Sequence, residues 1–326
     1  MALKNTPTSK YSRIRVGITL GDPSGVGGEI IAASFAQITK LAQCVIIGDR
    51  WVFDKFVVHR SPFSDLKFVD LKNIRHKTFS FGKIKAEYGK ASIEYLDKAL
   101  ELLCSNEIDC LVTCPISKEA IHRAGYKYSG HTEYLAQKTS ARQVEMMLLY
   151  QDLRFLLATR HIPIKAVPRA LHTQTLCQAI MLAYRSLISY FAVSNPRLVV
   201  CGLNPHASDN GIIGNEEARI IKPAVRRLKP TIRHLDGPLP ADAAISKAKD
   251  REYDCVVAMY HDQALIPLKL LGGYSGVNLT LGLRFVRTSP LHGTAFDIAG
   301  TGQADPSSLI EAVKCALECT VNLKRA

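Results

Sequence analysis

The segment Val256-Val257-Ala258-Met259-Tyr260-His261-Asp262-Gln263 shows how the chain is organised, because an apolar run ends abruptly in four polar side chains. A short apolar run of this kind is typical of a buried strand. Proteins of the α/β class place ligand-binding side chains just beyond the carboxyl ends of such strands. His261 is therefore a candidate metal ligand, and Lys269 farther along is a candidate anion anchor. On local evidence alone, a core strand followed by a plain polar turn is the favoured alternative.

Similar apolar runs recur along the chain and alternate with amphipathic segments. Strands are predicted at 13–20, 43–47, 68–69, 109–113, 146–150, 155–159, 198–201 and from 256 onward. Helices are predicted at 91–103, from 117, from 132 with Thr132 as the cap, at 172–192, at 216–228 with a kink or break at Pro223, and at 307–321. This alternation predicts an α/β fold with a mainly parallel sheet and one hairpin at 146–159.

The first predicted strand runs into a glycine-rich segment, Gly21-Asp22-Pro23-Ser24-Gly25-Val26-Gly27-Gly28-Glu29. Strand, glycine loop and helix is the layout of a phosphate or dinucleotide cradle. Gly25 and Gly27 fit the dinucleotide pattern, but Ile30 stands where the third glycine belongs, and no P-loop Gly-Lys-Ser/Thr follows. A structural turn and a ligand loop remain equally open for this segment.

Composition describes a globular chain of 326 residues with 47% hydrophobic residues. No apolar run approaches the ~18 residues that a membrane helix needs. The nine cysteines lack zinc-ribbon or thioredoxin spacing. We therefore expect reduced thiols and a cytoplasmic protein. The polar segment 1–13 is predicted to be a disordered tail.

The formal net charge of +13 raises nucleic acid as a partner and a basic, non-catalytic binding protein as a function. The basic side chains are densest at 219–233, and no aromatic residues interleave with them to stack on bases. A solvated helix explains this region better than a nucleic-acid surface does. A positive field also suits an anionic substrate.

Three histidines occupy matching places: His161, His206 and His261 each follow a predicted strand and lie in a predicted loop. Three neutral imidazoles can hold a divalent ion and leave positions open for substrate, on which the ion acts as a Lewis acid. The histidines are far apart in sequence, so the fold must bring them together. A second predicted loop, at 236–242, carries two carboxylates, Asp236 and Asp242.

Several longer blocks stand in a recognisable order. The most specific are Asn204-Pro205-His206-Ala207 and Met259-Tyr260-His261-Asp262-Gln263; the others are 21–27, 130–133, 236–242, 278–283 and 287–289. Together they cover nearly the whole chain beyond its first residues. The chain resembles the 4-hydroxythreonine-4-phosphate dehydrogenases, NAD-dependent enzymes of pyridoxal phosphate biosynthesis.

The resemblance implies two α/β/α lobes around a cleft, as in isocitrate and isopropylmalate dehydrogenases. The first lobe, on the NAD side, would comprise 1–126 with 277–326. The second, 127–276, would carry the metal ligands and the dimer contacts. The implied assembly is a homodimer with the active site near the subunit interface, with neither nucleic acid nor membrane as a partner.

The resemblance also implies a set of site residues. The metal ligands would be His161, His206 and His261, holding Zn, Mg or Co. The substrate-binding residues would be His131, Thr132, Lys269, Asn278 and Arg287. NAD, with NADP as the alternative, would bind at Gly293, Thr294 and Asp297. The catalytic residues would be Lys269, Asp242 and Asp262, with the choice of proton acceptor between the two aspartates left open.

The implied reaction is oxidation of the C3 hydroxyl of 4-phosphohydroxy-L-threonine, followed by decarboxylation to 3-amino-2-oxopropyl phosphate. A related family acts on four-carbon sugar-acid phosphates such as threonate or erythronate 4-phosphate. The two groups share the metal site, so the three histidines do not separate these two substrate classes.

Overall fold

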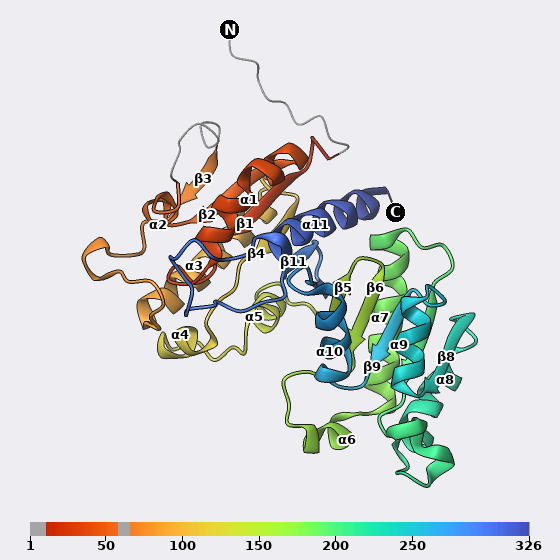
Figure 1. Cartoon of the computed structure of the whole chain (residues 1–326). Helices are drawn as coiled ribbons and strands as arrows, with labels where there is room; N and C mark the ends of the chain where they lie inside the picture. Colours follow the sequence, from red (N-terminus) through yellow and green to blue (C-terminus); the bar gives the residue numbers. More distant parts are fainter. Residues whose placement is uncertain (1–10, 58–65, 326) are drawn as a thin grey trace. The chain divides into compact units, whose positions relative to one another are not determined.

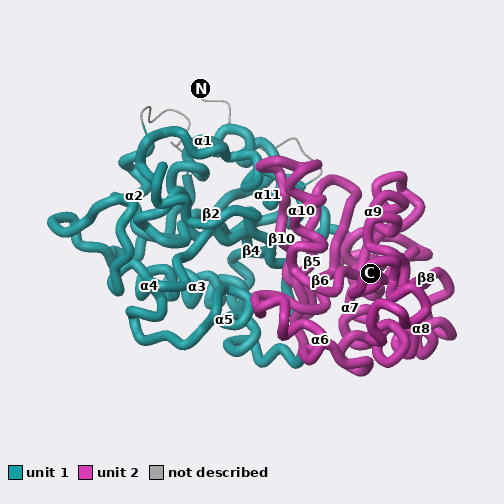
Figure 2. Tube along the Cα trace, turned by 60° about the horizontal axis from the view of Figure 1, so that its bottom comes forward, with its two compact units in different colours: residues 1–142, 283–321 teal, residues 143–282, 322–326 magenta. Residues whose placement is uncertain are grey.

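The protein folds as two compact α/β units in a computed structural model that describes residues 11–57 and 66–325 (Figure 2). Unit 1 comprises 1–142 and 283–321, and unit 2 comprises 143–282 and 322–326. The α/β prediction with two lobes is confirmed. The boundaries differ from those predicted, because 127–142 lies in unit 1 and 277–282 in unit 2. Most of the predicted N-terminal tail, 1–10, lies outside the described residues.

Unit 1 contains a parallel sheet, and its central strands β1 (Arg15–Thr19) and β4 (Cys110–Thr113) are buried (Figure 1). In spatial order the strands are β3 (Lys67–Asp70), β2 (Gln43–Gly48), β1, β4 and β11 (Arg287–Pro290). All four residues of β4 are buried, as are Val16 to Thr19 of β1. Burial on both faces explains why these strands appear as continuous apolar runs in the sequence.

The helices of unit 1 include all the helical segments predicted there, and α2 (Arg50–Asp54) is an additional helix that was not predicted. The other helices are α1 (Gly27–Leu41), α3 (Ala86–Cys104), α4 (Lys118–Arg123), α5 (His131–Lys138) and α11 (Ser307–Arg325), with a short turn at η2 (His76–Thr78). Ser117 caps α4, since its hydroxyl accepts from the Ala120 N–H at 3.1 Å. The predicted cap at Thr132 is wrong: α5 begins at His131 after Gly130, so Thr132 lies inside the first turn.

Unit 2 contains a mixed sheet. In spatial order the strands are β10 (Val277–Leu281), β5 (Glu145–Tyr150), β6 (Leu153–Leu157), β9 (Cys255–Ala258), β7 (Arg197–Cys201) and β8 (His234–Leu239). The β5–β6 pair is antiparallel, which confirms the predicted hairpin. The β10–β5 pair is also antiparallel, whereas β6, β9, β7 and β8 run parallel.

The helices of unit 2 correct several expectations. They are α6 (Val167–Ala170), α7 (Thr173–Phe191), α8 (Lys222–Leu228), α9 (Ala241–Lys249) and α10 (His261–Gly272), with 3-10 turns at η3 (Ile164–Ala166) and η4 (Pro205–Gly211) and a π-helical segment at η5 (Glu217–Ile221). The predicted basic helix is continuous, but its first part is the π-helical η5, which runs directly into α8 with Pro223 in the first turn of α8. Asp236 and Asp242 do not share a loop, because β8 and α9 occupy most of it.

Two general properties follow from the described residues. None of the helices in 11–57 and 66–325 has the combined length and apolar character required to cross a bilayer. All nine cysteines lie in the described part and are free thiols, most of them buried. Burial in apolar surroundings favours the uncharged thiol, as the raised pKa of Cys114 illustrates.

Candidate functional site

The carboxyl ends of β6, β9 and β7 lie side by side, because these strands are neighbours in the sheet of unit 2. The Thr159 hydroxyl, just past β6, donates to the carbonyl of Met259, just past β9, at 2.7 Å. The Gln263 amide donates to the carbonyl of Gly202, just past β7, at 2.9 Å, and its oxygen accepts from the Met259 N–H at 2.7 Å. These bonds tie together the three segments that carry the predicted histidine ligands.

Two of the three histidines are adjacent. The ring centroids of His161 and His261 lie 5.8 Å apart. His261 Nδ1 lies 2.7 Å from Asp262 Oδ1, and because a carboxylate only accepts hydrogen bonds, Nδ1 is the donor. The Nε2 lone pair of His261 is then left for another partner, an arrangement typical of histidine ligands held by a carboxylate. His261 is the first residue of α10 and not a loop residue as predicted.

His206 lies in a strained segment. Residues 206–210 within η4 have φ between 43° and 73°, and none of the five is glycine. The left-handed conformation costs L residues roughly 1–2 kcal/mol each, so the surrounding structure must hold it. The buried Glu217 does part of this, accepting from the Asn204 N–H at 2.7 Å and from its side-chain amide at 2.9 Å. Backbone strain of this kind is common in functional segments, which agrees with the predicted role of His206.

The donor chemistry of these residues suits a divalent transition metal, since imidazole nitrogen is its common ligand. His161 and His261 provide two neighbouring rings, one already oriented by a carboxylate. Within 11–57 and 66–325 of a single chain, however, no group of three or more His, Cys, Asp or Glu side chains is arranged to hold a metal ion. The assignment of all three histidines to one ion therefore stays a prediction.

Unit 1 contains a buried cation at the start of β11. Arg287 is 1% exposed, and its Nε and Nη2 donate to the Thr113 hydroxyl at 3.1 and 2.6 Å. Burial lowers the pKa of Arg287 to about 9, and the nearby Glu133 carboxylate opposes this effect. The guanidinium thus remains charged at neutral pH in a poorly solvated place, where it attracts an anion strongly.

Two uncompensated polar atoms lie in the same unit. His131 Nε2 is buried and has no hydrogen-bond partner among the described residues. Burial first, and then the charge of Arg287, hold the pKa of His131 well below its usual range, so the ring is neutral. Thr19 Oγ1 is also buried without a partner, and Thr19 is in register with Thr113 on the neighbouring strand. Buried polar atoms of this kind are completed by water or a ligand.

The glycine-rich segment allows the start of α1 to pack closely against neighbouring backbone segments. A Cβ on Gly27 would lie 1.9 Å from the Leu20 carbonyl oxygen, so only glycine fits there. The Val26 N–H donates to the Thr294 carbonyl at 3.1 Å, and Glu29 accepts from the Gly300 N–H at 3.0 Å. The start of α1 therefore holds the 293–300 loop in place. This favours the structural alternative for the segment.

The 293–300 loop has features that suit a cofactor. Gly293 and Asp297 are exposed, and a Cβ on Gly293 would meet nothing within 4 Å. His292 Nε2, beside them, is buried and lacks a partner among the described residues. A loop with open backbone and an unpaired ring nitrogen is compatible with the predicted NAD contacts.

Comparisons with known proteins indicate one family along most of the chain. Residues 29–316 match the model of the family described as "Pyridoxal phosphate biosynthetic protein PdxA". The chain belongs to this family. It is 42% identical to the 4-hydroxythreonine-4-phosphate dehydrogenase of Sulfurihydrogenibium sp. (strain YO3AOP1), across 93% of this chain and 98% of that one. It is 40% identical to the D-threonate 4-phosphate dehydrogenase of Cupriavidus necator, across 93% and 96%.

Solved structures give the same result. The 4-hydroxythreonine-4-phosphate dehydrogenase of Klebsiella pneumoniae is 34% identical, with a TM-score of 0.84 over 94% of this chain and 98% of that chain. The PdxA family and the dehydrogenase class predicted from the sequence are thereby confirmed.

The remaining predicted residues of this PdxA-family chain lie in both units. In unit 2, Lys269 is exposed on α10, Asp242 is exposed in the first turn of α9, and Asn278 is half-buried in β10 opposite Leu148. In unit 1, Thr132 is buried in α5 beside His131. Of the two candidate aspartates, Asp262 contacts a predicted metal ligand, because it accepts the hydrogen bond from His261.

Three residues that position the site escaped the sequence-based prediction. Thr113 holds Arg287, Gln263 ties β9 to β7, and Glu217 fixes the turn before His206. Gln263 ends the polar segment that directly follows the predicted buried strand at 256–259, and a polar side chain at that place could have indicated a hydrogen-bonding role. Nothing local distinguishes Thr113 or Glu217, because their partners come from distant parts of the chain.

Asp22 in the glycine-rich segment is a buried carboxyl group. Its Oδ1 accepts from the Ser24 N–H at 2.9 Å, whereas Oδ2 is buried without a partner among the described residues. Burial raises the pKa of Asp22 to about 7, against a partial lowering by Ser24. The folded protein therefore keeps the proton in the range between the ordinary carboxyl pKa and about pH 7, where the unfolded chain has lost it.

We expect Asp22→Asn to change the pH dependence of stability. A raised pKa in the folded state stabilises the fold at low pH, and this contribution is lost as pH rises towards 7. The asparagine variant lacks this loss, so its advantage in unfolding free energy over the wild type should grow between pH 5 and pH 7 by about 1.4 kcal/mol per pH unit at most. Urea unfolding at pH 5, 6, 7 and 8 measures this. The exposed Asp250→Asn is the control; equal pH profiles for wild type and Asp22→Asn would contradict the expectation.

Proposed function

We propose that this chain is an NAD- and divalent-metal-dependent dehydrogenase that oxidises 4-phosphohydroxy-L-threonine at C3, with decarboxylation to 3-amino-2-oxopropyl phosphate, in pyridoxal phosphate biosynthesis. The observation that carries the proposal is the buried cation Arg287 beside the neutral His131, in a chain of the PdxA family. A phosphorylated or carboxylated substrate is attracted by that cation and offers a partner to the ring nitrogen of His131.

Substrate binding is assigned to five residues. Arg287 receives an oxyanion of the substrate, and Lys269 offsets further negative charge as a solvated point charge. His131, Thr132 and Asn278 supply hydrogen bonds. Because His131 is held neutral, it binds by hydrogen bonding and adds no second cation beside Arg287.

The metal ligands are proposed to be His161, His206 and His261, with zinc, magnesium or cobalt as the ion. A bound ion would supply Lewis-acid assistance at the hydroxyl that is oxidised. Asp262 keeps the proton of His261 on Nδ1, so that Nε2 is the ligating atom. Asp242 and Asp262 remain the two candidates for accepting the substrate proton, and Lys269 is the third proposed catalytic residue.

The cofactor is proposed to bind at Gly293, Thr294 and Asp297, with NAD preferred over NADP. NAD supplies the acceptor for the hydride. The Thr294 carbonyl is fixed by the Val26 N–H, so the loop is set before the cofactor arrives. Oxidation at C3 creates a ketone β to the carboxylate, and such an acid loses carbon dioxide because the electrons flow into the ketone.

The assembly is proposed to be a cytoplasmic homodimer with the site near the subunit interface. A single chain does not gather three ligands within its described residues, which a second copy can supply. Ile266, Leu270 and Tyr274 form an exposed apolar stripe along α10 and just past its end, at 59%, 82% and 73% exposure. The stripe starts close to His261, so covering it with a second copy also encloses the site. The cysteines form no disulfides among the described residues, which is typical of proteins in the reducing cytoplasm.

A second candidate is D-threonate 4-phosphate dehydrogenase activity, favoured by the 40% identity to the Cupriavidus necator enzyme. Both substrates carry a phosphate and a carboxylate, which the same cations recognise. They differ in the group at C2, which is an amine in one and a hydroxyl in the other.

An NADH-forming assay on both substrates tests the proposal. We expect turnover of 4-phosphohydroxy-L-threonine to exceed that of D-threonate 4-phosphate, to fall on chelation, and to return when zinc, magnesium or cobalt is added back. Turnover of D-threonate 4-phosphate alone would move the assignment to the second candidate. A full rate in chelator, with metal content verified as zero, would contradict the metal site.

A further inference from the structure

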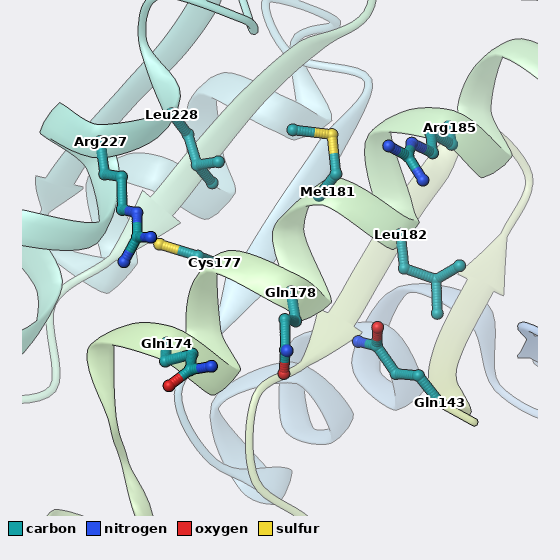
Figure 3. A pocket seen from close by; sticks show the side chains of 9 residues that line it. All are labelled: Gln143, Gln174, Cys177, Gln178, Met181, Leu182, Arg185, Arg227 and Leu228. Atoms are coloured by element: carbon teal, nitrogen blue, oxygen red, sulfur yellow. The ribbon is translucent and has the colours of Figure 1, made fainter.

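A groove in unit 2 lies between α7 and α8 and belongs to none of the residues assigned above (Figure 3). Its volume is about 340 Å³, within the range of small-molecule sites. Nine residues line it: Gln143, Gln174, Cys177, Gln178, Met181, Leu182, Arg185, Arg227 and Leu228. Most come from α7 at helical spacing, so they form one stripe along that helix. The opposite wall comes from α8.

The groove is positively charged and contains no carboxylate. Neither Arg185 nor Arg227 forms an ion pair or side-chain hydrogen bond within the described part of the chain, and no Asp or Glu lines the groove. Lys222 and Arg226 on the same short helix are exposed as well. Figure 3 shows the Arg227 guanidinium beside the Cys177 sulfur, with Arg185 two turns farther along α7. An unpaired guanidinium in a concave place is a ready partner for an oxyanion.

The remaining lining residues indicate which chemical groups a ligand of this groove would carry besides an oxyanion. Met181, Leu182 and Leu228 give an apolar floor, which favours a ligand with a hydrocarbon part. Gln174 and Gln178 offer amides that both donate and accept. The two arginines come from different helices, and Cys177 and Arg185 are about 12 Å apart along α7. Two separate oxyanion groups on a short apolar body match this arrangement better than a single phosphate does.

We propose that the groove between α7 and α8 is a binding site for a short dicarboxylate, with Arg227 and Arg185 each receiving one carboxylate and Met181 and Leu228 contacting the carbon chain. The site is independent of the proposed reaction. A bound dicarboxylate ties α8 to α7, and α7 packs on β5, β6 and β10. Binding therefore stabilises unit 2 by mass action.

Calorimetric titration of the full-length protein with glutarate tests the site, with butyrate and inorganic phosphate as the other two ligands. We expect glutarate to bind, butyrate to bind more weakly because one carboxylate is missing, and phosphate to bind more weakly because the apolar part is missing. Arg227→Gln should raise the dissociation constant for glutarate by about tenfold to a hundredfold, which is the loss expected when a hydrogen bond to a charged group is removed. Arg226→Gln removes the same charge from the same helix without lining the groove, and should leave binding unchanged.

Thermal unfolding gives a second readout that requires no turnover. Glutarate should raise the melting temperature of the wild type and of Arg226→Gln alike, and should raise that of Arg227→Gln much less. Equal weakening of glutarate binding by Arg226→Gln and Arg227→Gln, equal shifts in the melting temperature of the two variants, or tighter binding of phosphate than of glutarate would each overturn the proposal. So would the absence of any binding at millimolar glutarate.

Discussion

His206→Ala is expected to reduce NADH formation to below about a hundredth of the wild-type rate, since even an outer partner of a metal ligand is worth roughly 10- to 100-fold. The variant removes one of the three proposed imidazoles from a turn that the fold holds at a cost in backbone strain. The measurement is the turnover number with saturating substrate and NAD, together with the metal bound per chain after dialysis. Metal content should fall with activity, while the melting temperature and the oligomeric state stay those of the wild type.

A histidine outside the proposed site provides the matched control. His172 is exposed at the start of α7, and His172→Ala should leave turnover and metal content unchanged. Normal metal content in His206→Ala with lost turnover would show that His206 acts on the substrate and not as a ligand. Normal values of both would remove His206 from the site.

Thr113→Val is expected to raise the KM for the phosphorylated substrate by about tenfold to a hundredfold, the effect of losing hydrogen bonds made by a charged donor. The Thr113 hydroxyl accepts from both Nε and Nη2 of Arg287 and so fixes the direction of the guanidinium. Valine keeps the shape and removes this acceptor, so the guanidinium loses the two hydrogen bonds that help to fix its direction. Because Thr113 acts through Arg287, the turnover number should change much less than the KM.

Thr113→Ser distinguishes positioning from packing. Serine restores the acceptor and lacks only a methyl group, so the KM should return close to that of the wild type. If valine and serine raise the KM equally, the methyl group matters and the hydroxyl does not. If neither changes the KM while the wild type turns over the substrate, Arg287 does not depend on Thr113. If the wild type itself fails to act, the proposed substrate is wrong.

Arg287 shows why this part of the site needed the tertiary structure. Its role as an anion-binding residue rested on resemblance alone, since one arginine in a polar segment is compatible with a surface position. The fold buries it to 1% exposure and supplies Thr113, 174 residues away in the chain. Hydrogen bonds of such sequence separation leave no local pattern, because each partner lies in an ordinary strand.

For the three histidines, the sequence predicted the strands that precede them but not the local backbone that holds them. Apolar runs ending in polar residues predicted β6, β7 and β9, and parallel strands with their carboxyl ends at one edge bring the following segments together. The sequence did not predict that His261 begins a helix or that 206–210 adopts a left-handed turn. The turn opposes the intrinsic preference of its own residues, so only contacts from elsewhere, such as those of Glu217, can maintain it.

The sequence by itself determined the α/β class, most strands and helices, the family and the set of candidate ligands. These depend on local apolar periodicity and on blocks of residues, both of which are written along the chain. Only the tertiary structure decided the unit boundaries at 142/143 and 282/283, the burial of Arg287 and Asp22, and the groove between α7 and α8. Each of these depends on desolvation or on contact between distant segments, and neither exists until the chain has packed.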